Sequence, residues 1–132
     1  MGSAEAVKSV DTNILARLIL VDDPVQTPVS EEIVRRGVRV SLTVLLELGW
    51  LLGSRAGKSR AEVNLALLKL LDNEAIHVED DAQVRAALEL FRQGADLADV
   101  IHLVAARGSE AFVTFDKGVP SGDDIGVDVE LV

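Results

Sequence analysis

Four acidic residues lie inside or directly beside apolar stretches of the chain: Asp11, Glu47, Asp99 and Asp116. Most other acids come in clusters that water can solvate, such as Asp22-Asp23. A carboxylate drawn into apolar surroundings must be protonated, paired with a cation or bound to a metal. Because too few cations lie near these four acids to pair them all, a shared divalent metal is the simplest solution. The four residues are therefore predicted to form a catalytic metal site.

The composition restricts which metal this site would take. The chain has no cysteine and only two histidines, His77 and His102, which excludes a thiolate zinc site and nearly excludes a multi-histidine one. Oxygen ligands favour Mg²⁺, with Mn²⁺ as a substitute. The lack of cysteine also fits a reducing cytoplasm, where we expect the protein to act.

Strands separated by helices are predicted along the whole chain. Short apolar runs bounded by turn residues indicate strands, and apolar residues three and four apart indicate helices. Ser59 and Glu62 form a capping-box pattern, and Asp96 is placed to cap the helix after it. The predicted strands are 7–10, 38–41, 75–78, 111–115 and 127–131; the predicted helices run from Asp11 to Asp22 and over 28–36, 43–55, 59–71, 81–92 and 97–107. This order indicates an α/β fold with a parallel sheet covered on both faces.

Such a sheet would bring the four acids together. Ligands gather beyond the carboxyl ends of parallel strands, and Asp11 and Asp116 each end a predicted strand. Asp99 lies in the first turn of a helix that should begin at the same edge, and Glu47 lies one turn into the helix after the second strand. The expected result is a small volume that holds one or two Mg²⁺ ions, which could activate a water and stabilise charge in an in-line attack.

Each acid also has a simpler interpretation. Asp11 could cap the helix that follows it, and Glu47 could belong to a solvated stripe. Asp99 could be a first-turn acid favoured by the helix dipole, and Asp116 could belong to an ordinary turn. Their joint placement at one predicted edge, and no single residue, favours the metal site.

Neighbouring polar side chains are candidates for holding these acids by hydrogen bonds. Thr12, Asn13 and Thr114 are short enough for this role, although Thr12 and Asn13 could equally cap a helix. His102 lies one turn beyond Asp99 and could face the site, but it is expected in the core or partly exposed. Trp50 is expected in the core or an interface rather than as a platform for a nucleobase.

The size and charge of the chain bound its function further. A chain of 132 residues with 48% hydrophobic residues is expected to form one domain, with residues 1–6 as a flexible lead-in or a vector remnant. The net charge is −9, and it is concentrated in residues 61–132, which hold fifteen acidic and five basic side chains. Such a chain binds nucleic acid poorly in general. Any nucleic-acid function must use metal ions and the local basic residues Arg35, Arg36, Arg39, Arg55, Lys58 and Arg60.

Four blocks of the sequence resemble those of PIN-domain ribonucleases, in order and at similar spacing. The closest likeness is to VapC-type toxins of prokaryotic toxin–antitoxin pairs. The blocks are Val10-Asp11-Thr12-Asn13-Ile14-Leu15, Leu46-Glu47-Leu48, Ala95-Asp96-Leu97-Ala98-Asp99-Val100-Ile101-His102-Leu103 and Thr114-Phe115-Asp116-Lys117. The resemblance covers essentially the whole chain, but residues 118–132 carry no matching motif.

The resemblance implies a three-layer α/β/α fold and a Mg²⁺- or Mn²⁺-dependent endoribonuclease. It implies a homodimer and a cognate VapB-type antitoxin that blocks the site. Carried over, the metal-binding acids are Asp11, Glu47, Asp99 and Asp116. Asp96 is a further candidate, although the family more often uses the second acid of that block.

Two other functions fit a small acidic α/β domain. A receiver-type signalling domain also binds Mg²⁺, but it needs an acceptor Asp in mid-chain and a separate Lys near the end. No Asp occurs between Glu47 and Asp72, and Lys117 directly follows Asp116. A PIN-like scaffold without activity is the second alternative, and the presence of all four acids argues against it.

Overall fold

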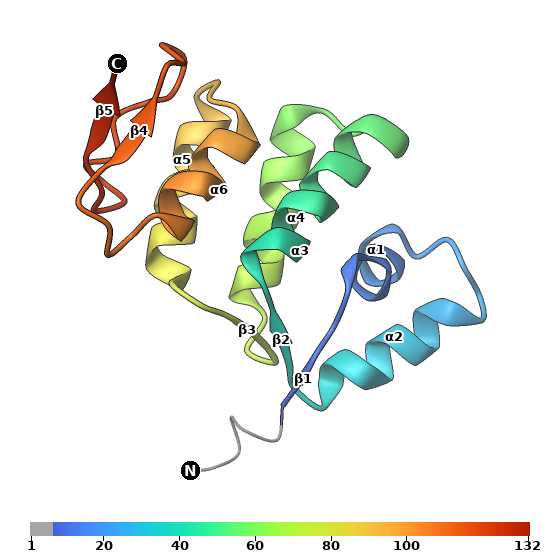
Figure 1. Cartoon of the computed structure of the whole chain (residues 1–132). Coiled ribbons are helices and arrows are strands. Elements are labelled where there is room, and N and C mark those ends of the chain that lie inside the picture. Colours follow the sequence, from blue (N-terminus) through green and yellow to red (C-terminus); the bar gives the residue numbers. More distant parts are fainter. Residues whose placement is uncertain (1–6) are drawn as a thin grey trace.

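The computed structural model describes residues 7–132, so the lead-in expected at residues 1–6 lies outside the described residues. Strands and helices alternate along this part of the chain (Figure 1). The strands are β1 (Lys8–Ser9), β2 (Val38–Val40), β3 (Ile76–Val78), β4 (Phe112–Thr114) and β5 (Val129–Leu131). The helices are α1 (Thr12–Leu20), α2 (Gln26–Arg35), α3 (Leu42–Trp50), the π-helical turn η2 (Leu51–Arg55), α4 (Arg60–Asp72), α5 (Asp81–Arg92) and α6 (Leu97–Ala105). Each predicted element is confirmed, with ends that shift by a few residues.

Side-chain caps start several of the helices where the sequence predicts them. The Ser59 hydroxyl accepts a hydrogen bond from the Glu62 backbone N–H at 3.2 Å, and the Glu62 carboxylate accepts one from the Ser59 N–H at 2.8 Å. This reciprocal pair satisfies two backbone donors that the first turn of α4 leaves unpaired. Asp96 caps α6 by accepting from the Ala98 N–H at 2.7 Å.

The first three strands form a parallel sheet in the order β1-β2-β3. Lys8 pairs with Val38, and Val38 pairs in turn with Ile76. Helix α2 contacts β2 and helix α4 contacts β3. In Figure 1, α1 and α2 lie to the right of the sheet and α3 to α6 lie above it and to its left. The prediction of an α/β fold with a central parallel sheet is confirmed.

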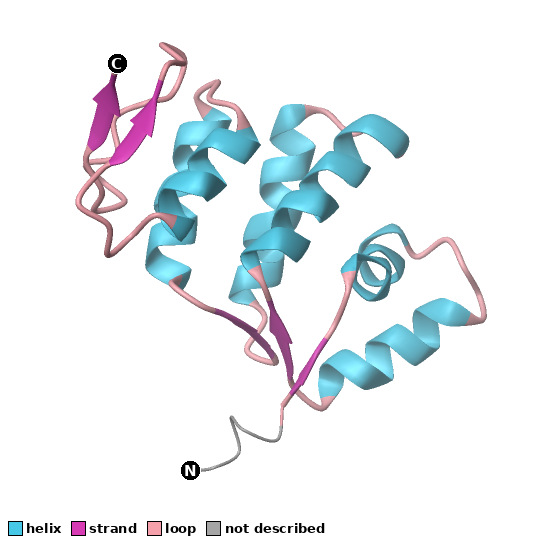
Figure 2. Ribbon diagram, viewed as in Figure 1, coloured by secondary structure: helices cyan, strands magenta, loops and turns pink. Residues whose placement is uncertain are grey.

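The last two strands do not join this sheet. β4 and β5 form a separate parallel pair, in which Phe112 pairs with Val129 and Thr114 with Leu131 (Figure 2). The expectation that the fourth strand shares an edge with the first is therefore wrong for this structure. The backbone groups of β4 pair instead with the segment around β5. The Phe112 N–H donates to the Asp128 carbonyl at 2.7 Å, and the Val132 N–H donates to the Thr114 carbonyl at 3.0 Å.

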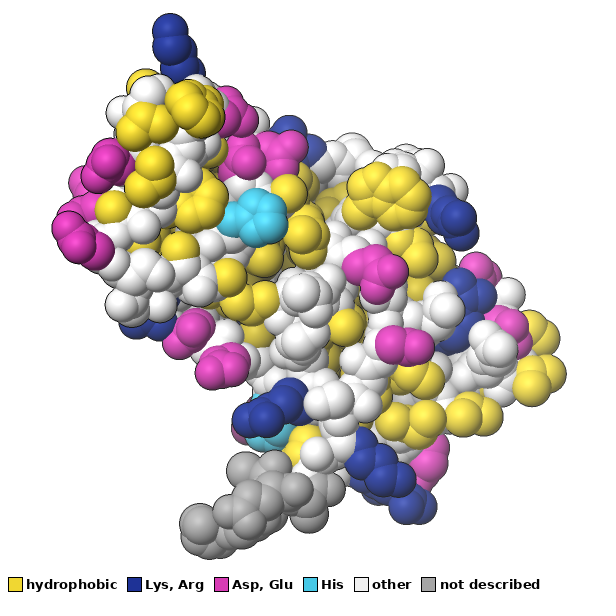
Figure 3. All heavy atoms as spheres, in the orientation of Figure 1, with side chains coloured by type: hydrophobic (Ala, Val, Ile, Leu, Met, Phe, Trp, Pro, Cys, Tyr) yellow, Lys and Arg dark blue, Asp and Glu magenta, His cyan; other side chains and the backbone are white. Residues whose placement is uncertain are grey.

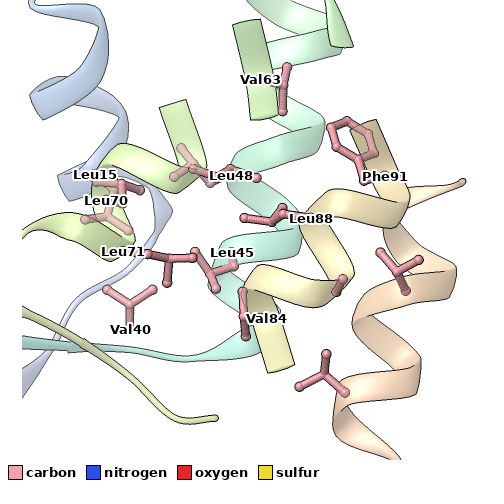
Figure 4. Close-up of a cluster of buried hydrophobic side chains, with 14 of the residues drawn as sticks. Leu15, Val40, Leu45, Leu48, Val63, Leu70, Leu71, Val84, Leu88 and Phe91 are labelled. Atoms are coloured by element: carbon pink, nitrogen blue, oxygen red, sulfur yellow. The ribbon is translucent and has the colours of Figure 1, made fainter. Parts of the chain in front are cut away.

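An aliphatic core joins the helices to the central sheet. Leucine and valine side chains from α1, β2, α3, α4 and α5 pack together, and Phe91 closes one end of the cluster (Figure 4). Burial of this apolar surface is the main favourable term in folding. In the part of the chain that the structure describes, no helix is both long and apolar enough to cross a membrane.

Candidate active site

Two of the four predicted metal-binding acids share a pocket at the end of β1. Asp11 follows this strand and caps α1, where its carboxylate accepts from the Ile14 N–H at 3.4 Å. Glu47 comes from the middle of α3, which packs against α1. Between them lies a pocket of about 280 Å³. Its lining residues are Asp11, Thr12, Asn13, Glu47, Trp50, Leu51 and Arg55.

Thr12 connects the two helices at this pocket. Its side chain is buried, and its hydroxyl donates a hydrogen bond to a carboxylate oxygen of Glu47. Since Asp11 rather than Thr12 caps α1, the hydroxyl of Thr12 is available for this contact. The neighbouring Asn13 is exposed and lines the same pocket. Thr12 thus fixes the position of Glu47 relative to Asp11.

The remaining acids gather around the start of α6. Asp99 is half-buried in the first helical turn, and Asp96 precedes it at the cap. Burial raises the pKa of Asp99, and the negative charges of Asp96 and Asp116 raise it further, against the smaller effect of His102. Proximity of like charges disfavours ionisation of a carboxylic acid. Asp116 is therefore close enough to Asp99 for their charges to interact.

The loop after β4 holds Asp116 in place. The Asp116 carboxylate accepts from the Gly118 N–H at 2.7 Å, and the Asp116 N–H donates to the Thr114 hydroxyl at 2.9 Å. Thr114 therefore contacts the backbone of Asp116 rather than its carboxylate. The residues after β4 therefore form a turn that the side chains of Thr114 and Asp116 stabilise. This agrees with the simpler interpretation of Asp116 as a turn residue.

The structure places the acids in two groups, Asp11 with Glu47 and Asp99 with Asp96 and Asp116. Within residues 7–132, no three acidic or histidine side chains lie close enough together to hold one metal ion. Convergence of all four acids on one volume therefore stays a prediction. The separate pairing of β4 with β5 is consistent with this division, because Asp116 follows a strand that does not belong to the sheet containing β1.

The expectation that apolar surroundings enclose these acids is wrong for three of them. Asp11, Glu47 and Asp116 are exposed, and Asp99 alone is partly buried. Glu47 lies on the outward side of α3, one turn after the exposed Thr43, because the helical period brings both to the same face. No ion pair within residues 7–132 involves any of the four.

Two residues differ from what the sequence suggested. Trp50 is 59% exposed, so the expectation of a core position is wrong for it. Arg55 was a member of the basic set but was not predicted to line the site, which it does beside Trp50. His102 is exposed, so it does not lie in the core.

The chemistry of the donors fits a hard divalent cation. Every acid in the two groups offers carboxylate oxygens, which Mg²⁺ and Mn²⁺ prefer. Exposed carboxylates without a cationic partner can take such an ion without first breaking an ion pair. Asp11 with Glu47, and Asp99 with Asp116, are therefore the residues that would hold it.

Comparison with known protein families agrees with this chemistry. The sequence profile of the PIN domain matches residues 8–123, a span that contains Asp11, Glu47, Asp99 and Asp116. This match excludes the receiver-type alternative. No curated protein and no solved structure matches the chain. The chain therefore belongs to the PIN-domain family, whose members are generally metal-dependent nucleases.

Proposed function

We propose that the protein is a Mg²⁺- or Mn²⁺-dependent endoribonuclease that cleaves RNA phosphodiester bonds with an activated water. The observation that carries this proposal is a PIN domain whose four candidate metal-binding acids, Asp11, Glu47, Asp99 and Asp116, form no ion pair among the described residues. Carboxylates that no Lys or Arg side chain neutralises are suited to bind a divalent cation. An acid needed only for stability would more often be paired.

The four acids supply two pairs of carboxylates. Asp11 and Glu47 supply one pair of carboxylates, which Thr12 holds in register by its hydrogen bond to Glu47. Asp99 and Asp116 supply a second pair, whose charges interact, and Asp96 stands beside them at the cap of α6 as a further candidate ligand. When bound, the metal supplies a lowered pKa for its water and neutralises charge on the phosphate. Burial and neighbouring negative charges raise the pKa of Asp99, so a positive charge placed beside this acid would favour its ionised form.

Cleavage of RNA by purified protein tests the proposal. In Mg²⁺ or Mn²⁺, the wild-type chain should cut total RNA, and Asp11→Asn should reduce the rate at least ~10²-fold because the metal loses a charged ligand. The variant should stay folded by circular dichroism. As a matched control, Asp123→Asn removes the same charge from an exposed position in the loop before β5 and should leave the rate unchanged. Equal cleavage in excess EDTA would rule out the metal-dependent mechanism.

The biological role proposed here is that of the toxin in a type II toxin–antitoxin pair, acting in the cytoplasm as a homodimer. A cognate VapB-type antitoxin would restrain the enzyme. Exposed carboxylates in a chain of net charge −9 attract a guanidinium, which binds carboxylates through two parallel hydrogen bonds. An Arg or Lys from a basic, flexible segment of the antitoxin would thereby compete with the metal.

A further inference from the structure

One aromatic side chain beside the acids has no structural role in the core. Trp50 is the single tryptophan of the chain and is 59% exposed, although tryptophan is usually highly buried. It lines the same 280 Å³ pocket as Asp11 and Glu47. A single exposed apolar side chain is ordinary on a protein surface, but this ring shares its pocket with two candidate metal-binding carboxylates and with the cation of Arg55.

Arg55 lies over this ring because the helix changes its winding. The Arg55 guanidinium carbon is 6.0 Å from the centre of the Trp50 ring, a distance at which a cation is attracted to an aromatic face. In an α-helix, residues five apart point ~140° away from each other. In η2 the Ala56 N–H instead donates a hydrogen bond to the Leu51 carbonyl at 3.1 Å. This wider π-helical winding brings residues five apart, such as Trp50 and Arg55, to the same side of the helix.

This π-helical turn strengthens the case for a function. Such turns are rare, and they occur frequently at functional sites. Arg55 belongs to this turn, and among the described residues it is the one cationic side chain that lines the pocket. The second arginine–aromatic pair, Arg60 over the buried Phe91, instead donates to the Phe91 and Ala95 carbonyls and holds helices together. Arg55 makes no such bond within residues 7–132.

We propose that Trp50 and Arg55 bind one nucleotide of single-stranded RNA beside the cleaved bond, which deepens the ribonuclease function proposed above and rests on it. The base stacks on the exposed surface of the Trp50 ring, and the Arg55 guanidinium donates hydrogen bonds to the adjoining phosphate. Base stacking on aromatic side chains tolerates any sequence, since every base has a π-face. The phosphate is then placed next to the carboxylates of Asp11 and Glu47.

The charges around the ring favour RNA over a protein ligand. A nucleotide has both a flat base for Trp50 and a phosphate for Arg55. An arginine from a protein partner such as the antitoxin would bind the carboxylates of Asp11 and Glu47 rather than the Trp50 ring, because the like charge of Arg55 lies beside that ring. Arg55 thus offsets locally the net charge of −9, which would otherwise repel the substrate.

Intrinsic fluorescence tests the stacking directly, because the chain has one tryptophan and no tyrosine. The Asp99→Asn chain, whose substitution lies outside the pocket, keeps the RNA intact in Mg²⁺. A short single-stranded RNA should quench Trp50 saturably, whereas an abasic oligonucleotide of equal length should not. Quenching by a basic peptide but not by RNA would identify the ring as a protein contact and overturn the proposal.

Variants in the same Asp99→Asn background separate the two contacts, with labelled RNA and fluorescence anisotropy as the readout. Trp50→Ala should weaken binding at least about tenfold, and Trp50→Phe should weaken it less. Arg55→Gln should weaken binding and reduce its salt dependence by about one charge. Lys69→Gln is the matched control, because it removes one charge from a different groove. It should bind as the parent chain does.

The inference and the proposed function fail separately. RNA cleavage that persists while Trp50→Ala binds RNA like the parent chain would overturn the nucleotide site alone. Quenching by RNA without any metal-dependent cleavage would overturn the ribonuclease and leave an RNA-binding site at Trp50. Weaker binding accompanied by a change of oligomeric state in Trp50→Ala, seen by sedimentation, would assign the ring to a subunit interface and overturn the proposal.

Discussion

At the scale of single residues, Thr12 contributes most to the geometry of the Asp11–Glu47 pocket. It is a buried residue at the first position of α1, and its hydroxyl reaches across to Glu47 on α3. Hydrogen bonds of this kind orient metal-binding carboxylates, and their loss typically costs 10- to 100-fold in metal affinity or activity. The position of Glu47 therefore depends on Thr12, a side chain that would act on a bound metal only through Glu47.

Thr12→Val tests this dependence. Val has nearly the same shape but no hydroxyl, so Glu47 loses its hydrogen bond while the packing stays. We expect RNA cleavage to fall ~10- to 100-fold and the Mg²⁺ concentration needed for half-maximal rate to rise. Thr12→Ser keeps the hydroxyl and should retain most of the activity. Equal activities of the Val and Ser variants would show that this hydrogen bond does not matter for the site.

Asp99 shows how an acid that is a candidate metal ligand can oppose stability. Its pKa is raised above the ordinary value of 3.8, first by burial and then by the charges of Asp96 and Asp116. The native state therefore holds the proton more tightly than the unfolded chain does. The contribution of Asp99 to stability falls as the pH rises from 3.8 to its raised pKa, and it stays unfavourable above that pH.

Asp99→Asn should consequently be neutral or stabilising at pH 7 in metal-free buffer and should lose this advantage below the ordinary pKa. Urea midpoints of both chains at acidic and neutral pH measure the difference. Millimolar Mn²⁺ should raise the melting temperature of the wild-type chain more than that of the variant, because the ligand stabilises the native state. A large destabilisation by Asp99→Asn, together with no effect of Mn²⁺, would mean that this acid is structural.

At the scale of elements, the contact between α3 and α6 determines how the two acid groups are spaced. Helix α3 carries Glu47, and α6 carries Asp99. Gly49 lies at this contact, and a Cβ atom placed there would collide with a methyl group of Leu97. By contrast, a Cβ atom at Gly53 would meet only Val63, at an ordinary 3.9 Å. Gly49 thus allows a close approach that Gly53 does not need.

Comparison of Gly49→Ala with Gly53→Ala measures how much the close contact between α3 and α6 at Gly49 contributes to stability. Neither glycine has a positive φ, so alanine fits the backbone at both positions, and the difference between the variants reports mainly the overpacking, which typically costs about 1–3 kcal/mol. Gly49→Ala should therefore be the less stable chain in urea and the slower nuclease. Adding Leu97→Ala to Gly49→Ala should recover part of the loss caused by the clash. Equal stability of the two glycine variants would contradict this account.

At the scale of the whole molecule, charge is distributed unequally. On the face that Figure 3 shows, acidic side chains lie over the C-terminal strands, and basic side chains lie mainly over the lower and right parts of the molecule. The basic residues belong mostly to the first half of the chain, which also contains Trp50 and Arg55. A negatively charged substrate would therefore approach the Asp11–Glu47 pocket from the N-terminal side, where repulsion is weakest.

The proposed toxin role makes a prediction for the living cell. Expression of the chain alone should arrest bacterial growth, because uncontrolled cleavage of RNA stops protein synthesis. Asp11→Asn should abolish the arrest, and so should co-expression of an antitoxin from the neighbouring gene. Growth curves together with immunoblots of the protein measure the effect. Unimpaired growth at high levels of intact protein would leave the toxin role without support, even if a weak nuclease activity remained.

The elements and their caps were predictable from the sequence because they depend on neighbours along the chain. Helix α5 covers Asp81–Arg92 as its apolar spacing predicted, and the capping box at Ser59 depends on residues three apart. The PIN resemblance also follows from local blocks around Asp11, Glu47, Asp99 and Asp116. Local periodicity and hydrogen bonding within one turn determine such features, so a single sequence contains them.

Only the tertiary structure decided how these pieces meet. β4 pairs with β5 rather than with β1, and this places Asp116 with Asp99 instead of with Asp11. The exposure of Trp50 and the turn that lays Arg55 over it depend on how α3 continues into η2. Strand partners and helix faces are chosen by competition between contacts distant in sequence, and the spacing of residues along the chain does not determine which contact is the more stable.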